Sequence, residues 1–264
     1  MRLGLIGLGA IGSEVVAAAD RGELPGIELA AVIVRRARKA NTAPRLITND
    51  ADAFFRERFD AVLECAGHAA VRDHGVRALA AGADLLVTSA GALTDDALLN
   101  ALRSAAEQGD ARLIVPSAGI GALDILAGAA VGGLEEVTVT VRKDPLSWKG
   151  TEAEAAHDLD RLTGPVTLYD GPVREGARRY PQNVNIAAAA ALAGIGLDRT
   201  RLVIIADPGI ATHVVEITAH GRFGRFSFRE DVIPTDANPK TGRLVAMAVI
   251  KTVRQLAGRF VVGG

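Results

Sequence analysis

A glycine-rich turn near the N-terminus constrains this sequence more than any other feature. A GxGxxG motif at 7–12 follows a short apolar run at 3–6 and precedes a helical pattern at 13–20. In that context the glycines allow a tight turn, close approach of a ligand to the backbone, and close packing of helix on strand. The N–H groups at the start of the helix favour an anion such as a pyrophosphate. The residues that we expect to contact this ligand are Gly7, Gly9, Ala10, Ile11 and Gly12.

Glycines that serve only a turn are the alternative interpretation, and the rest of the first half argues against it. Buried strands are expected at 3–6, 29–34, 61–64, 85–88 and 113–115, and helices at 13–20, 69–81 and 95–108. Strands that alternate with helices are typical of βαβ units and of a parallel sheet. We therefore predict an α/β fold, with a Rossmann-type doubly wound parallel sheet that binds a dinucleotide.

The pattern changes after Pro116. Helices are expected at 120–131 and 186–196, and strands at 136–141, 202–206, 213–219 and 225–228. These elements indicate a second domain of the α+β class. The stretch 144–179 is rich in proline, glycine and charge, and we expect it to cross the surface.

The C-terminal segment is expected to return to the first domain. Asn238-Pro239 resembles an N-cap with proline at the first helical position. The segment 244–256 is apolar almost all round in its first half, which predicts a buried helix. We therefore predict a dinucleotide-binding domain at 1–117, a substrate and catalytic domain at 118–238, and a helix at 239–264 that packs back onto the first domain.

Charge and composition narrow the range of partners. The chain has 30 Lys+Arg and 31 Asp+Glu, so nothing in its charge favours nucleic acid or an anionic membrane. Ala17-Ala18-Ala19 after an apolar start resembles a signal peptide, but the glycines interrupt that start. No apolar run reaches the roughly 18 residues of a membrane span. The single cysteine, Cys65, excludes an internal disulfide and a Cys-rich zinc site, so we predict a protein of the cytoplasm that holds no metal. The balanced charge favours a small molecule as its ligand.

Two arginines stand where the cofactor's ribose is usually recognised. NAD-specific sites carry an acidic residue about 20 residues beyond the glycine motif. This chain has Arg35 and Arg36 at that place. A guanidinium can donate two charge-assisted hydrogen bonds to a 2′-phosphate. We therefore expect NADP as the preferred cofactor and NAD as the weaker one, with a solvated basic loop as the alternative.

His213 is the candidate for proton transfer. It follows a strand end and turn at 206–212 and opens the next predicted strand. An imidazole at such a position can exchange protons near neutral pH, although a structural histidine is an equally open interpretation. We expect His74 and His157 on the surface and His220 in a turn, and Cys65 as a small buried residue.

Several motifs along the chain form an ordered set. They are the loop 7–12, residues 88–93, 115–121 with Leu123-Asp124, Arg142-Lys143, 181–185, Ala206-Asp207-Pro208 before His213, and 238–241. In order and spacing the set resembles the L-aspartate dehydrogenase family over essentially the whole chain. The resemblance implies NAD(P)-dependent oxidative deamination of L-aspartate to oxaloacetate and ammonia through iminosuccinate, or the reverse amination. It also implies a homodimer and a place in NAD biosynthesis.

The resemblance implies roles for particular residues. His213 matches the family's proposed catalytic histidine, and Asn183, Ala118 and Gly119 match residues that contact the cofactor. The chain departs from the family at Ser117-Ala118-Gly119, where Ser-Gly-Ala is more usual, and at Thr212, where asparagine is more usual.

A dicarboxylate substrate needs cationic, amide or hydroxyl donors. The candidates are Ser117, Lys143, Asn185 and Lys240, and an exposed position in a helix cap is the alternative for Lys240. Two other functions stay open at this point. One is a related two-domain NADP-dependent reductase of another imine or aldehyde, and the other is a non-catalytic NADP-binding sensor protein.

Overall fold

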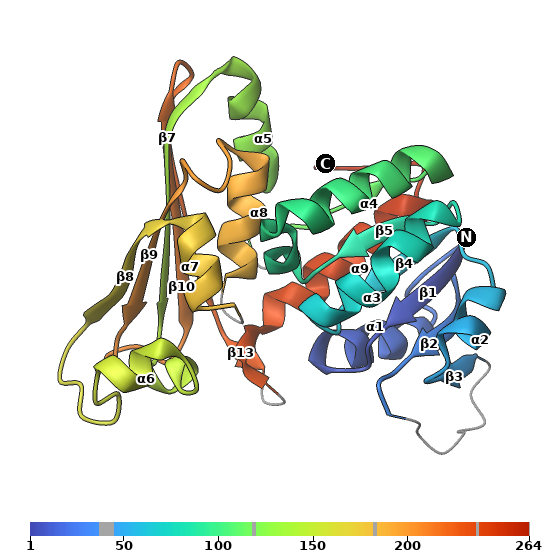
Figure 1. Ribbon diagram of the computed structural model, residues 1–264, viewed down its shortest axis with the longest axis horizontal. Helices are drawn as coiled ribbons and strands as arrows, with labels where there is room; N and C mark the ends of the chain where they lie inside the picture. The colour runs from blue at the N-terminus through green and yellow to red at the C-terminus, as the bar shows by residue number, and fades with distance from the viewer. Residues whose placement is uncertain (37–44, 118–119, 182–183, 236–237, 264) are drawn as a thin grey trace. The chain divides into compact units, whose positions relative to one another are not determined.

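The chain folds into two compact units. The computed structural model describes residues 1–36, 45–117, 120–181, 184–235 and 238–263, the last range with side chains from residue 241. Unit 1 comprises Met1–Pro116 and Ala246–Gly264, and unit 2 comprises Ser117–Val245 (Figure 1). Each unit has its own sheet and its own buried core, so each is described by itself.

Unit 1 is built on a parallel sheet. Within the described residues the sheet has six strands in the order β3-β2-β1-β4-β5-β6. They are β1 (Arg2–Ile6), β2 (Glu28–Ile33), β3 (Leu46–Thr48), β4 (Ala61–Glu64), β5 (Asp84–Val87) and β6 (Leu113–Ile114). The helices of this part are α1 (Ala10–Asp20), α2 (Ala51–Arg56), α3 (His68–Ala80), η1 (Ala90–Thr94) and α4 (Asp96–Gly109). The order confirms the doubly wound α/β prediction, since the chain moves outward from β1 to β3 and then restarts at β4 on the other side.

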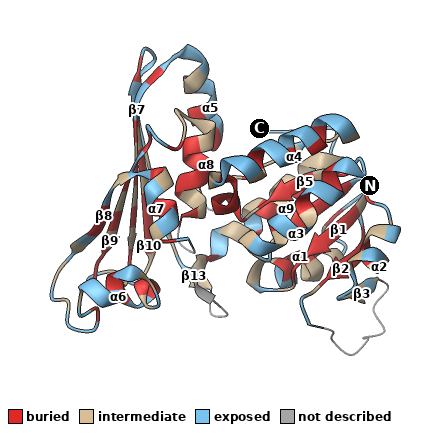
Figure 2. Cartoon of the chain, viewed as in Figure 1, coloured by how far each residue is buried: buried red, intermediate tan, exposed pale blue. Residues whose placement is uncertain are grey.

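Apolar residues bury the central strands of this sheet on both faces. Leu3, Leu5, Leu63, Leu85 and Leu86 have no exposed surface, and Figure 2 shows the strands of unit 1 largely in the colour of buried residues. Such double burial is typical of a parallel sheet that helices cover on both sides.

The five strands predicted for this half are present, and two short elements were missed. The strand β3 has three residues and the helix α2 has six, lengths too short for a hydrophobic period to show. Polar caps start two of the helices. The Asp50 carboxylate accepts from two backbone N–H groups of α2, and the Asp95 carboxylate does the same at α4.

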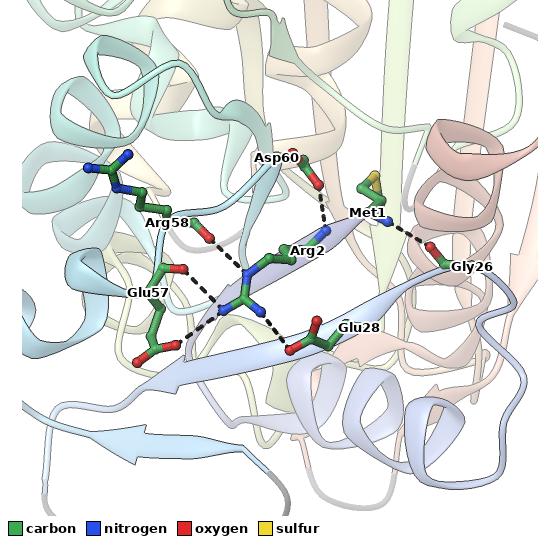
Figure 3. A network of polar contacts seen from close by, with 7 residues as sticks. All are labelled: Met1, Arg2, Gly26, Glu28, Glu57, Arg58 and Asp60. Carbon is green, nitrogen blue, oxygen red and sulfur yellow. Dashed lines mark hydrogen bonds and ion pairs between the residues drawn. The ribbon is translucent and has the colours of Figure 1, made fainter.

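A polar network joins the first strand to its neighbours (Figure 3). The Arg2 guanidinium donates to Glu28 Oε1 at 2.8 Å, to the Arg58 carbonyl at 3.3 Å, and to the carbonyl and carboxylate of Glu57. The Arg2 backbone N–H donates to Asp60 Oδ2 at 2.6 Å. These bonds satisfy strand-end groups that would otherwise face only water.

Unit 2 has a mixed sheet. As far as the chain is described, it has five strands in the order β11-β10-β7-β9-β8. They are β7 (Leu134–Lys143), β8 (Val166–Pro172), β9 (Arg201–Ala206), β10 (His213–Gly221) and β11 (Gly224–Val232). The helices of this unit are α5 (Leu123–Gly132), α6 (Glu152–Ala156), α7 (Val173–Arg179) and α8 (Asn185–Ala193), with the 3₁₀ turn η2 (Pro145–Trp148).

One face of this sheet forms the core of unit 2. Val137, Val139 and Val141 of β7 alternate with more exposed residues and are at most 1% exposed. The helices α5 and α8 pack against β7 and against each other, and the alanines of α8 are buried there. Small side chains let two helices approach closely, which explains the alanine-rich sequence of α8.

The structure corrects three expectations for the second half. The stretch 144–179 contains η2, α6, α7 and β8, and its Trp148 is fully buried. Asn238-Pro239 lies in β13 (Asn238–Gly242), which pairs with β12 (Pro234–Thr235), and the helix α9 (Arg243–Ala257) begins only afterwards. The helix α9 is buried on one side only, because Met247 is 62% exposed while Ala246, Val249 and Val253 are buried. Its second half carries polar residues on the exposed side.

His220 also differs from its prediction. It lies within β10 rather than in a turn, and its side chain is exposed beside Glu135. The turn itself begins after Gly221, where the chain reverses into β11.

Candidate functional site

The structure requires glycine at two of the three motif positions in the turn after β1. Gly7 has φ +100°, a conformation that side chains disfavour. A Cβ on Gly12 would collide with the Gly7 carbonyl oxygen and lie 3.2 Å from Cys65 Sγ. A Cβ on Gly9 would meet no described atom within 4 Å. Gly7 and Gly12 are therefore required by the turn and the packing of α1, whereas the fold itself leaves open space at Gly9.

The start of α1 suits an anion. Gly9 is its N-cap and supplies no side-chain acceptor, and the first turn, which contains Ala10 and Ile11, carries no acidic residue. The first N–H groups of a helix have no partner within the helix, and the helix dipole adds a partial positive charge. Open space at Gly9 and this uncapped helix end together fit the pyrophosphate of a dinucleotide.

The turn lies at the switch point of the sheet. β1 pairs with β2 on one side and with β4 on the other, and the chain leaves β1 at Gly7 and β4 at Cys65. Ligands of open α/β sheets bind beyond the carboxyl ends of the strands at this point. Cys65 packs behind the turn, with Sγ 3.5 Å from the Ile6 carbonyl, and burial raises the pKa of its thiol. The thiol therefore stays neutral and serves as packing.

Glu64 is a residue of this region that the sequence analysis did not single out. It ends β4 with no exposed surface, and its Oε1 accepts from the backbone N–H groups of Ala66 and Gly67, each at 2.7 Å. Ser89, after β5, donates to it through its N–H at 3.1 Å and its hydroxyl at 2.9 Å. Burial raises the pKa of Glu64 and these four hydrogen bonds oppose that rise. Glu64 thereby ties together two loops at the edge where the ligand is expected.

Arg35 and Arg36 follow β2 at the same edge. Both side chains are exposed, and neither forms an ion pair with the residues that the structure describes. Their guanidinium groups are thus accessible to an anion from solvent. The basic residues that follow them in the sequence, Arg38 and Lys39, lie outside the described residues.

In unit 2, two predicted site residues lie at the same end of the sheet. His213 opens β10, where Val214 pairs with Arg142 of β7, so the continuing register places Lys143 opposite His213. Both are buried, with exposed fractions of 6% and 4%. The Lys143 ammonium lies 5.8 Å from the ring centroid of Trp148, a contact that favours a cation. Ionisable side chains that are buried together at one end of a sheet are often found at functional sites, so this end is a candidate functional site.

An ion pair holds the loop that leads into His213. Arg142 Nη1 lies 2.9 Å from Asp207 Oδ2, while Asp207 Oδ1 accepts from the Gly209 N–H at 2.8 Å. The Asp207 N–H donates to the Lys143 carbonyl at 2.9 Å. Arg142 and Asp207 therefore hold the backbone at Lys143 and at the start of the loop that leads to His213.

Two more of the predicted site residues are described in this unit. Ser117 begins unit 2 and is partly exposed, and Asn185 is the first residue of α8. The predictions for Ala118, Gly119, Asn183 and the Lys240 side chain lie outside the described residues.

Glu230 is a second residue that the sequence analysis missed. It lies in β11, and its two carboxylate oxygens are buried without a hydrogen-bond partner. Burial raises the pKa of Glu230 to about 7. In the sequence, Glu230 stands between Arg229 and Asp231 and resembles part of an exposed charged run. Alternate residues of a strand share a face, so Phe226 and Phe228 could have indicated that Glu230 lies on the apolar face.

Two searches of the described residues bear on other kinds of site. No group of three or more His, Cys, Asp or Glu side chains in this part of the chain could hold a metal ion. Among the same residues, no helix has both the length and the apolar character needed to cross a bilayer.

Comparisons with known proteins agree with this architecture. A family model described as "Homoserine dehydrogenase, NAD binding domain" matches residues 7–116, and one described as "Aspartate dehydrogenase, C-terminal" matches residues 124–256. The L-aspartate dehydrogenase of Ruegeria pomeroyi is 43% identical over 258 residues, which cover 97% of this chain and 92% of that protein. That of Pseudomonas aeruginosa is 40% identical over 255 residues, covering 94% and 95%.

Solved structures show the same fold. The crystal structure of aspartate dehydrogenase from Thermotoga maritima has a TM-score of 0.78 at 23% identity, covering 100% of this chain and 99% of that one. A dihydrodipicolinate reductase from a Paenisporosarcina species has a TM-score of 0.52 at 14% identity, covering 97% and 94%.

The glycine turn, the switch-point loops and the second α+β unit define an oxidoreductase with a nicotinamide cofactor. Within that class, the chain belongs to the L-aspartate dehydrogenase family, which confirms the resemblance drawn from the motifs.

The glycine geometry predicts opposite effects for two substitutions. Gly9→Ala should leave the free energy of unfolding within about 0.5 kcal/mol of the original, since there is room for a Cβ. It should weaken cofactor binding by roughly tenfold or more, because the Cβ would take up space in which we expect the pyrophosphate. Gly12→Ala should instead lower the free energy of unfolding by about 1–3 kcal/mol. Urea unfolding and fluorescence titration with NADPH measure both, and unchanged cofactor affinity in Gly9→Ala would contradict the assignment.

The buried Glu230 carboxyl predicts a pH-dependent stability. Because its pKa is raised to about 7, the folded state binds more protons than the unfolded state between about pH 4.5 and pH 7. The resulting stability is complete at low pH and is lost as pH rises through about 7. The full shift corresponds to about 3 kcal/mol, and solvent near this half-buried side chain reduces it to ~1–2 kcal/mol.

Denaturant unfolding from about pH 5 to 8 compares the original chain with Glu230→Gln. The variant should lack the loss of stability near neutral pH. Glu216→Gln, the same change on the other face of the sheet, is the matched control. Parallel curves for the original chain and Glu230→Gln would show that Glu230 does not titrate as stated.

Proposed function

We propose that this protein is an NAD(P)-dependent L-aspartate dehydrogenase. It would convert L-aspartate to oxaloacetate and ammonia through iminosuccinate, or catalyse the reverse amination. Relatives with this name are 38–43% identical to the chain over most of its length. The single structural observation that carries the proposal is the buried pair of Lys143 and His213 at one end of the unit 2 sheet, in a protein whose other unit fits a dinucleotide.

Each unit would have its own task. Residues 1–117, with the C-terminal helix packed onto them, would bind the cofactor through Gly7, Gly9, Ala10, Ile11 and Gly12. Residues 118–238 would bind substrate and transfer protons. By resemblance to the family, Ala118, Gly119 and Asn183 would add contacts to the cofactor.

The residues of unit 2 supply what the deamination needs from the protein. The bound cofactor would accept a hydride from the substrate Cα. His213 would take a proton from the substrate ammonium, so that the nitrogen lone pair can form the imine. It would then assist the water that hydrolyses the imine. Lys143, with Ser117, Asn185 and Lys240 as further candidates, would bind the carboxylates through charge-assisted hydrogen bonds.

The preferred cofactor would be NADP. Arg35 and Arg36 are exposed beyond β2 and can pair with a 2′-phosphate, whereas NAD sites usually carry an acidic residue there. The single cysteine and the family resemblance support a cytoplasmic homodimer that acts in NAD biosynthesis.

An ammonia-dependent assay tests the function. Protein, NADPH and oxaloacetate should oxidise the cofactor rapidly only when ammonium is present, as seen from the absorbance of the reduced cofactor. Other oxo acids and aldehydes, each with and without ammonium, form the comparison panel. Turnover of one of these instead would indicate a related reductase, and cofactor binding without turnover of any would indicate a sensor.

In the same assay, His213→Ala should lower kcat roughly 100-fold or more while NADPH binding is retained. The reason is that the proton acceptor is lost but unit 1 is untouched. Near-normal turnover would refute the role of His213.

Arg35→Ala tests the cofactor preference. At roughly 1.5–3 kcal/mol for a charged hydrogen bond, the loss should raise the KM for NADP about tenfold or more. The KM for NAD should change little, since NAD has no 2′-phosphate. Arg21→Ala, an exposed arginine paired only locally with Glu23, is the control. Equal KM values for the two cofactors in the original chain would contradict the preference.

A further inference from the structure

A carboxylate without a partner lies on the same sheet face as His213. Glu230 of β11 pairs with Val215 of β10, and cross-strand partners share a face. Val215 and His213 are two residues apart in the same strand, so the side chains of His213, Val215 and Glu230 all point to one face of the sheet. His213 itself pairs with Val232, which makes Glu230 its diagonal neighbour, with Cα atoms ~7–8 Å apart.

This face is the covered one. Val215 and Ile217 of β10 are at most 1% exposed. Phe228, the neighbour of Glu230 on the same face of β11, lies 3.2 Å from where a Cβ on Gly121 would be. Both Glu230 oxygens are buried within this environment and accept no hydrogen bond.

The charged groups around Glu230 do not neutralise it. Across the sheet on the same face are His213 on β10 and Lys143 on β7, the latter two strands away. Arg229 and Asp231 on its own strand point to the opposite face and are exposed. Burial alone accounts for the raised pKa of Glu230, without a contribution from a neighbouring charge. The ionised carboxylate therefore has an unused capacity to bind a cation.

Resting on the proposed function, we propose that Glu230 binds the cationic nitrogen of the substrate. This nitrogen is the α-ammonium of the amino acid in deamination and the ammonium ion in amination. The separation of Glu230 from His213 is one that a single ammonium group can bridge, so the ion pair would hold the nitrogen where the imidazole takes its proton. Lys143, on the other side of His213, would serve the substrate's carboxylate. Glu230 forms an ion pair only, and no bond to it is made or broken.

A binding comparison isolates this role. L-aspartate and succinate are both four-carbon dicarboxylates, and only the first carries an ammonium. The affinities are measured by titration calorimetry with NADPH-saturated protein at about pH 8. The reduced cofactor prevents turnover, because oxidation of aspartate needs the oxidised cofactor. At this pH Glu230 is mostly ionised. The original chain should bind L-aspartate roughly tenfold or more tightly than succinate. In Glu230→Gln the two affinities should become nearly equal, with that for succinate unchanged.

Kinetics supply a second readout that a purely structural role would not move. Glu230→Gln should raise the KM for ammonium roughly tenfold or more in the amination reaction, while the KM for oxaloacetate stays within about twofold. Glu216→Gln on the opposite face should leave both values unchanged. Glu230→Asp keeps the charge on a shorter side chain and should give intermediate values, which covers the case in which the glutamine variant does not fold.

The outcomes separate the two proposals. If the original chain binds neither L-aspartate nor succinate and shows no amination, the proposed function fails. The role of Glu230 alone is overturned by a different result. In that case the original chain is active and prefers L-aspartate, and Glu230→Gln keeps both that preference and the original KM for ammonium. If the glutamine variant does not fold, the same result in Glu230→Asp has the same meaning.

Discussion

The close approach of α1 to the turn after β1 is the constraint on which unit 1 depends. With glycine at position 12, the helix start lies against the Gly7 carbonyl, and no side chain could fit between them. That contact directs the first N–H groups of α1 toward the carboxyl edge of the sheet, where Gly9 leaves the backbone open. Glu64 then fixes the loops beyond β4 and β5 at the same edge. The anion-binding geometry is thus a consequence of backbone packing rather than of charged side chains.

Unit 2 differs from unit 1 because its candidate site consists of ionisable side chains buried on the sheet rather than of backbone groups. Lys143 and His213 are both buried, the Lys143 ammonium lies near the Trp148 ring, and the ion pair of Arg142 with Asp207 holds the adjoining backbone. Ionisable groups are seldom buried except at functional sites or in structural ion pairs, and their concentration at one end of this sheet is the reason for proposing a site there. In the proposed function, the backbone of unit 1 would bind the cofactor and the side chains of unit 2 would transfer protons.

The long elements could be predicted because their signals are local. Apolar runs gave β1, β2, β4 and β5, and periodicity gave α3 and α4 to within a residue or two at most boundaries. The signals failed where elements are short, as in β3 and α2, or where local rules conflict. Asn238-Pro239 satisfies the rule for a helix start, yet pairing with Pro234–Thr235 draws it into a strand. The density of proline and charge at 144–179 likewise hid a segment that buries Trp148.

By itself the sequence determined the dinucleotide turn, the order of strands and helices, and the candidacy of His213, since each depends on residues within a few positions of one another. Only the tertiary structure decided which polar groups act together. Glu64 meets Ser89 across 25 residues and Arg142 meets Asp207 across 65, and Glu230 shares a face with His213 through strand pairing. The physical reason is that sheet register and burial arise from packing between distant segments, and burial raises the pKa of a glutamate that would keep its ordinary pKa at the surface.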